Sequence, residues 1–107
     1  MDKIIETWNS LDDYGGLDLL GYGSDINGNL YIYILADEVN LYLFTKVSQY
    51  DLDKFLDGNV DLLGTIEKGS DWITFDVDTN KVKNKYVSFQ DIDSKYLPES
   101  DYFCKLK

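Results

Sequence analysis

The dipeptide Asn27-Gly28 constrains the fold of this chain more than any other feature of its sequence. Asn and Gly both accept the positive φ angles of a two-residue hairpin turn, and the β-favouring run at residues 30–35 follows almost at once. We therefore predict a β-hairpin whose first strand covers residues 17–22. Within that strand, Gly21 and Gly23 indicate a bulge or a close approach by another group.

Apolar spacing and capping residues predict the other elements. Ser48 followed by Asp51 is close to a capping box and predicts a helix over residues 49–57. Asp61 can cap a second short helix, which Gly69 ends. The further strands are predicted at residues 4–8, 41–47, 72–77, 85–89 and 101–106. The predicted fold class is α+β: a single small domain over residues 1–107, with an antiparallel β-sheet meander and one or two short helices packed on one face.

Alternation along the two central strands predicts two chemically different faces of the sheet. One face is aliphatic, and the other is aromatic. The aromatic face carries Tyr31, Tyr33, Leu35, Tyr42 and Phe44. Two outcomes are open for it: the helix covers it with Leu52, Phe55 and Leu56, or it stays at the surface as a patch that binds a protein.

The composition excludes several kinds of chemistry. The 107 residues include 20 Asp plus Glu, one Cys and no His, so a Cys/His zinc site, a haem site, a His-dependent triad and an internal disulfide are excluded. Residues 76–80 begin like a calcium-binding loop, but Lys81 and Val87 replace the Gly and Glu that such a loop needs. We expect no enzyme activity, no cofactor and no metal, and we expect Cys104 to be structural.

The charge balance indicates the kind of partner. A net charge of −10 with no Arg repels phosphate, so we expect no direct binding to nucleic acid or membrane. No apolar segment approaches the ~18 residues of a membrane span, which predicts a cytoplasmic protein, in the host cytoplasm if a phage encodes it. The expected partner is a protein with a basic surface.

Two groups of residues are candidates for binding that partner. Asp53 and Asp57 lie four residues apart and share a helix face, and Asp61 follows one turn later if the helix continues. A face that keeps repelling charges suits a cationic partner, although a merely solubilising surface has the same pattern. The acidic candidates are Asp37, Glu38, Asp51, Asp53, Asp57 and Asp61, and the aromatic candidates are Tyr31, Tyr33 and Tyr42.

A strand that ends at Lys46-Val47-Ser48 is followed by Leu52, Phe55 and Gly58, which have the spacing leucine-x-x-leucine-x-x-glycine. Over about residues 3–78, this order resembles an uncharacterised family of small bacterial and phage domains. Phe55 stands where that family has an aliphatic residue. The resemblance implies the same fold pattern and no assigned activity.

Small size, the lack of catalytic residues and the negative charge favour a non-enzymatic acidic binding protein. We expect it to inhibit a basic nucleic-acid-binding host protein, of the anti-CRISPR or nuclease-inhibitor type, through partial DNA mimicry. The alternative is a small intracellular immunity or interaction domain that binds a cognate protein through the tyrosine-rich sheet face.

Overall fold

A computed structural model describes residues 6–15, 17–36 and 40–104 of the chain. One six-stranded antiparallel sheet has its strands in sequence order: β1 (Asn9–Tyr14), β2 (Leu17–Ser24), β3 (Leu30–Leu35), β4 (Leu41–Val47), β5 (Ser70–Asp76) and β6 (Lys81–Tyr86). Two helices, α1 (Gln49–Leu56) and α2 (Leu62–Glu67), connect β4 to β5. Two 3-10 turns follow β6, η1 (Phe89–Asp91) and η2 (Ser94–Tyr96). The predicted α+β meander is confirmed.

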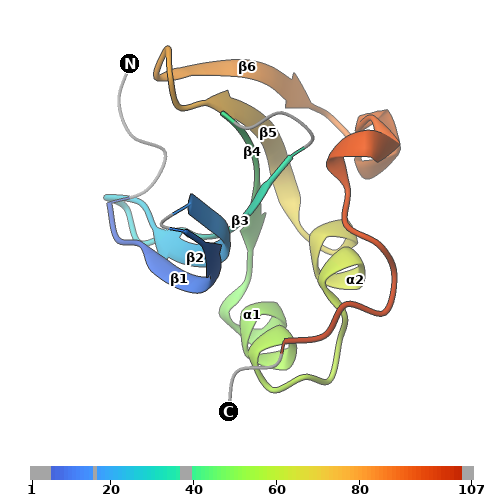
Figure 1. The fold of residues 1–107 in the computed structure, drawn as a ribbon. Coiled ribbons are helices and arrows are strands. Elements are labelled where there is room, and N and C mark those ends of the chain that lie inside the picture. The colour runs from blue at the N-terminus through green and yellow to red at the C-terminus, as the bar shows by residue number, and fades with distance from the viewer. Residues whose placement is uncertain (1–5, 16, 37–39, 105–107) are drawn as a thin grey trace.

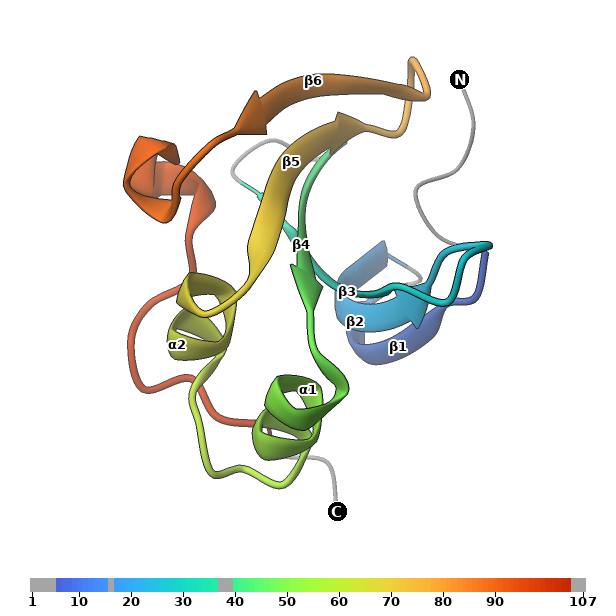
Figure 2. The same cartoon turned by 180° about the vertical axis from the view of Figure 1, so that it is seen from behind.

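The sheet is strongly twisted, with β1 and β2 at one end and β6 at the other (Figure 1). The helices α1 and α2 lie side by side at one side of the sheet. After η2 the chain runs past α2 toward α1, so the C-terminal segment lies on the same side as both helices (Figure 2). This arrangement brings residues after η2 close to residues from the N-terminal half of the chain.

The hairpin between β2 and β3 forms where it was predicted, but its turn is longer. The backbone N–H of Asp25 donates to the carbonyl of Asn29 (2.9 Å), which leaves three residues in the loop. Only Gly28 of this loop has a positive φ, at 85°, whereas a two-residue turn of the predicted type needs two such residues. The Asp25 carboxylate accepts the backbone N–H groups of Asn27 and Asn29 (both 2.9 Å), and these hydrogen bonds stabilise the longer loop.

The predicted capping residues begin both helices. The backbone N–H of Asp51 donates to Ser48 Oγ (3.1 Å) at the start of α1, and that of Gly64 donates to Asp61 Oδ1 (2.9 Å) at the start of α2. α1 ends before Gly58, whose φ of 79° suits a residue that follows a helix. The helix therefore does not continue to Asp61, which is the N-cap of α2 instead.

Three strand predictions are wrong in whole or in part. Residues 6–8 are not a strand, because the first strand begins at Asn9, and residues 4 and 5 lie outside the described residues. The strand predicted at residues 85–89 lies at Lys81–Tyr86, because Asn80 adopts a φ of 58° and the chain reverses directly after β5. Residues 101–104 form no strand, and residues 105 and 106 lie outside the described residues.

The C-terminal segment is held by α2 instead of by the sheet. The backbone N–H of Asp101 donates to Asp61 Oδ2 (2.8 Å), and that of Leu62 donates to the carbonyl of Tyr102 (2.8 Å). Asp101 also has a φ of 66°, which no strand residue adopts. These backbone groups have partners at the start of α2, so they are not available to a sheet edge.

The helices pack on the aliphatic face of the sheet, which corrects the prediction that Leu52, Phe55 and Leu56 cover the aromatic face. Leu52 and Phe55 are buried in one cluster with sheet residues Ile32, Ile34 and Leu43. Cys104 is buried in the same cluster, as a structural role requires. The connection from β4 to β5 through α1 and α2 thus covers the face of the central strands that carries the aliphatic side chains, together with the buried Thr45.

The aromatic face is nevertheless buried at its centre, so it is not the exposed patch of the other prediction. Tyr33, Tyr42, Phe44 and Phe75 form a second cluster, in which Tyr33 is 0% exposed. The ring of Trp8 lies over it, with its centroid 5.0 Å from that of Tyr33 and 6.0 Å from that of Phe44. A segment before β1, outside the sheet, covers this face.

Gly21 provides the space for the Tyr33 ring. The two residues are paired between β2 and β3, and a Cβ atom at position 21 would lie 2.3 Å from the Tyr33 hydroxyl oxygen and 2.6 Å from the Asn9 carbonyl oxygen. The close approach predicted for this glycine is confirmed. The absence of a side chain here allows β1 and the ring of Tyr33 to pack against the same point of β2.

Candidate binding surfaces

The outer face of α1 presents Tyr50, Asp53 and Asp57, and we call these three residues the α1 face. Their spacing of three and four residues places them on one side of the helix, opposite the buried Leu52 and Phe55. Tyr50 is 68% exposed, and both carboxylates are exposed. Asp53 accepts a hydrogen bond from Gln49 Nε2 (2.9 Å).

Lys54 lies on the same helix but does not neutralise the two carboxylates. Its Nζ lies over the ring of Tyr50, 5.3 Å from the ring centroid. No ion pair joins Lys54 to Asp53 or Asp57 within the part of the chain that the structure describes. The α1 face therefore combines an exposed aromatic ring with two exposed negative charges.

The other acidic candidates have structural contacts or lie elsewhere. Asp51 lies in the first turn of α1, where its backbone N–H donates to Ser48 Oγ, and its side chain is half-buried. Asp61 caps α2 and binds the C-terminal segment, and the N–H groups of Asp101 and Gly64 hold the pKa of its carboxyl below the ordinary value. Asp37 and Glu38 lie outside the described residues.

Two of the three candidate tyrosines belong to the core. Tyr33 is 0% and Tyr42 8% exposed, so neither ring reaches the surface as the predicted patch required. Both hydroxyl groups donate to Asp18, Tyr33 to Oδ2 (3.2 Å) and Tyr42 to the backbone carbonyl (2.6 Å). Burial, and then the negative charge of Asp18, raise the pKa of both hydroxyls.

Tyr31 is half-buried and lies beside a hollow of about 260 Å³. Asp71 and Lys85 line the same hollow, and Asp71 Oδ2 lies 3.8 Å from Lys46 Nζ. Burial, and then the charges of Asp25 and Asp71, raise the pKa of the Tyr31 hydroxyl. Tyr31 is thus the one candidate tyrosine near the surface, and it lies in a mixed-charge region of the sheet, apart from the α1 face.

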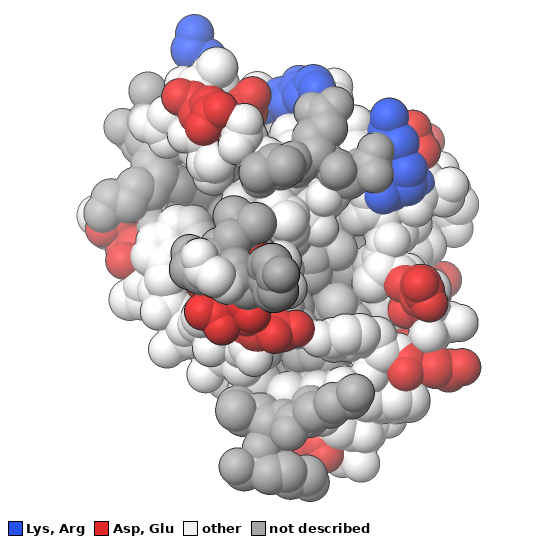
Figure 3. All heavy atoms as spheres, in the orientation of Figure 1, with Lys and Arg blue, Asp and Glu red and all other residues white. Residues whose placement is uncertain are grey.

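Charge is unevenly distributed over the molecule. The carboxylates in Figure 3 form separate groups over the visible face, while the lysines gather toward the end of the sheet that carries β6. β6 alone carries Lys81, Lys83 and Lys85. Carboxylates also lie beside these lysines, since Asp76 of β5 pairs with Lys81 of β6. α1 lies at the opposite end of the molecule (Figure 1).

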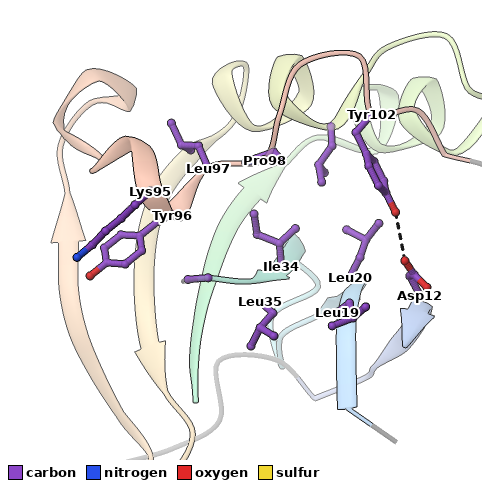
Figure 4. A pocket seen from close by; sticks show the side chains of 12 residues that line it. Asp12, Leu19, Leu20, Ile34, Leu35, Lys95, Tyr96, Leu97, Pro98 and Tyr102 are labelled. Carbon is purple, nitrogen blue, oxygen red and sulfur yellow. Dashed lines mark hydrogen bonds between the residues drawn. The ribbon is translucent and has the colours of Figure 1, made fainter. Parts of the chain in front are cut away.

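A groove of about 290 Å³ lies between the C-terminal segment and the sheet, and we call it the C-terminal groove (Figure 4). The ends of β2 and β3 form its floor. Leu97 and Pro98, which belong to the C-terminal segment, form its roof. At one end the Tyr102 hydroxyl donates to Asp12 Oδ2 (3.3 Å), and Lys95 and Tyr96 lie at the other end. Most of the lining side chains are apolar: Leu19, Leu20, Ile34, Leu35, Ala36, Leu62, Leu97 and Pro98.

No family model matches the chain, and no curated protein or solved structure matches it either. The resemblance to an uncharacterised family therefore adds no family assignment. None of the described helices has the length and apolar character to cross a membrane. Among the described residues, no three Cys, Asp or Glu side chains are grouped so that they could hold a metal ion.

Sequence reasoning missed Tyr50 and the C-terminal groove. Tyr50 could have been found, because it falls three and seven residues before Asp53 and Asp57 on the polar side of the predicted helix. The groove has no comparable signal in the sequence. Its lining residues come from β1 to β3, from α2 and from the segment after η1, and only the folded chain brings them together.

Proposed function

We propose that this chain is a non-enzymatic acidic binding protein, and that its α1 face binds a basic surface on a protein partner. The observation that carries the proposal is the placement of Asp53 and Asp57 beside the exposed ring of Tyr50, with Lys54 turned onto that ring. Tyrosine is enriched among residues that dominate binding energy, and carboxylates around it would steer a positively charged partner.

The partner class that fits best is a nucleic-acid-binding protein, because such proteins carry basic grooves that complement carboxylates. Occupation of that groove would exclude the nucleic acid, so binding would inhibit the partner. This is the mode of action expected of a nuclease inhibitor or an anti-CRISPR protein. The net charge of −10 supports the proposal, since it accelerates association with a basic surface and repels nucleic acid itself.

The alternative through the tyrosine-rich face has less support. Tyr33 and Tyr42 lie in the core, where the ring of Tyr33 packs against those of Tyr42 and Phe44 and both hydroxyl groups donate to Asp18. Their replacement would change the stability of the fold instead of a contact with a partner. Among those three tyrosines, Tyr31 alone could contribute to an interface without rearrangement of the sheet.

The proposal is tested by capturing partners from a lysate of the source cell with the tagged protein. The column is washed in steps from ~50 to ~500 mM salt, and parallel columns carry Asp53→Asn/Asp57→Asn or Tyr50→Ala. We expect a nucleic-acid-binding protein that is released as salt rises, is displaced by its own DNA or RNA, and is lost from both variant columns. A partner that resists salt, ignores nucleic acid and is retained equally by the variants would contradict the proposal.

A further inference from the structure

The C-terminal groove has the size of a small-ligand site. An engineered apolar cavity of about 150 Å³ holds one benzene molecule, so a groove of about 290 Å³ has room for a ligand with about two fused rings. Its floor and roof are apolar, which favours a ligand that buries carbon. The groove is open to solvent along one side, so such a ligand could enter without unfolding the segment that covers it.

The polar groups of the groove are at its ends, and they carry opposite charges. At one end Lys95 Nζ lies 5.3 Å from the centroid of the Tyr96 ring. At the other end stands the Tyr102 hydroxyl, which donates to Asp12 Oδ2, while no described residue donates to Asp12 Oδ1. A ligand in the groove would therefore meet a carboxylate oxygen with unused accepting capacity at the Tyr102 end.

The Tyr102 end of the groove is held in place by the start of α2. Asp101 precedes Tyr102, and its backbone N–H binds Asp61, whose pKa is held below the ordinary value by this and a second backbone hydrogen bond. The burial of Tyr102 and the charge of Asp12 raise the pKa of the Tyr102 hydroxyl, so this group stays a neutral donor. The negative charge at the Tyr102 end of the groove is therefore that of the Asp12 carboxylate.

We infer that the C-terminal groove is a binding site for a small organic ammonium ion with an apolar ring system, whose ammonium group pairs with Asp12. The ring system would lie between the floor of Leu20 and Ile34 and the roof of Leu97. The net charge of −10 also concentrates cations near the surface and disfavours anions of the same shape. This site shares no residue with the α1 face, so the test of ligand binding is independent of the test of the proposed function.

The test is an NMR titration of the whole chain with tryptamine, followed by indole-3-propionate, which presents the same ring with a negative charge. We expect tryptamine to saturate with a dissociation constant on the order of 1 mM or tighter, and to shift amide signals of residues that line the groove. Indole-3-propionate should bind at least threefold more weakly. Saturable binding of both compounds with equal affinity would overturn the assignment of an ammonium ligand.

Three variants locate the site. Asp12→Asn should weaken tryptamine binding threefold to tenfold while leaving the groove open, and Ala36→Leu should abolish binding because it fills the groove. Glu67→Gln removes the same charge from α2, outside the residues that line the groove, and should leave the affinity unchanged. An equal loss in Asp12→Asn and Glu67→Gln, or shifts outside the groove, would show attraction to the acidic surface in general and would overturn the inference. Asp12→Asn keeps this test decisive if Ala36→Leu does not fold.

Discussion

The contact between Gly21 and Tyr33 predicts a large effect for the smallest possible substitution, Gly21→Ala. The added Cβ would lie 2.3 and 2.4 Å from the hydroxyl oxygen and the Cζ of Tyr33, and 2.6 Å from the Asn9 carbonyl oxygen. Tyr33 is 0% exposed and the third atom belongs to the backbone, so neither neighbour can move aside freely. Overpacking of this kind costs about 1–3 kcal/mol, and we take the upper end of this range.

An opposing contribution comes from the unfolded chain, since replacing Gly by Ala lowers its entropy by an equivalent of about 0.4–1 kcal/mol. The expected net loss of unfolding free energy is therefore about 2–2.5 kcal/mol, or about 10 °C in Tm for a domain of this size. Gly28→Ala is the comparison variant. A Cβ at position 28 meets no atom within 4 Å, so only the left-handed φ of 85° costs energy, about 1–2 kcal/mol.

A double-mutant cycle with Tyr33→Leu separates the cost of the contact with Tyr33 from the cost of the backbone conformation of a glycine. The free energy of unfolding of each variant is measured by urea denaturation. Leu lacks the two ring atoms that the Cβ would meet, so Gly21→Ala should cost at least 1 kcal/mol less in the Tyr33→Leu background. Gly28→Ala should cost the same in both backgrounds, within about 0.5 kcal/mol. A Gly21→Ala protein as stable as the natural sequence, or full additivity with Tyr33→Leu, would refute the packing argument.

Three further predictions concern stability. Asp61→Ala should cost about 1–2 kcal/mol in denaturation experiments and accelerate amide exchange at Asp101, because α2 loses its cap and the C-terminal segment loses its acceptor. Phe55→Ala should cost about 3–5 kcal/mol and lower Tm accordingly, because the ring is fully buried between α1 and the sheet. The raised pKa values of Tyr33 and Tyr42 mean that the unfolded chain loses these protons first, so the stability that these two tyrosines contribute should be constant below about pH 10 and fall above it. Denaturation midpoints between pH 8 and 11 check this, and Tyr33→Phe should reduce the slope.

Local signals in the sequence predicted much of the fold. Ser48 and Asp61 cap their helices through hydrogen bonds within a few residues, and Gly28 sits in the hairpin loop that it was expected to form. These predictions hold because the physical cause lies within the segment itself. The same local reasoning predicted the wrong loop length, because the side chain of Asp25 adds two hydrogen bonds that favour a third loop residue.

Long-range choices were not predictable in the same way. β3 and β4 carry apolar residues on both faces, so the sequence does not predict which face the helices cover. The structure places the helices on the aliphatic face and Trp8 on the aromatic face. The C-terminal segment looked like a strand, yet Asp61, 40 residues away in sequence, binds its backbone. Tyr33 and Tyr42 are not surface residues for the same reason, since burial depends on partners outside the strand.

The most direct test of the account measures the affinity of the captured partner for three forms of the protein at two salt concentrations. The forms are the natural sequence, Asp53→Asn/Asp57→Asn, and the control Asp13→Asn/Glu67→Gln, which removes two exposed charges from β1 and α2. If the α1 face is the binding surface, Asp53→Asn/Asp57→Asn should weaken binding about tenfold or more and flatten its salt dependence, while the control stays within about threefold of the natural sequence. Equal weakening by both double variants, or none by either, would contradict the assignment of binding to α1.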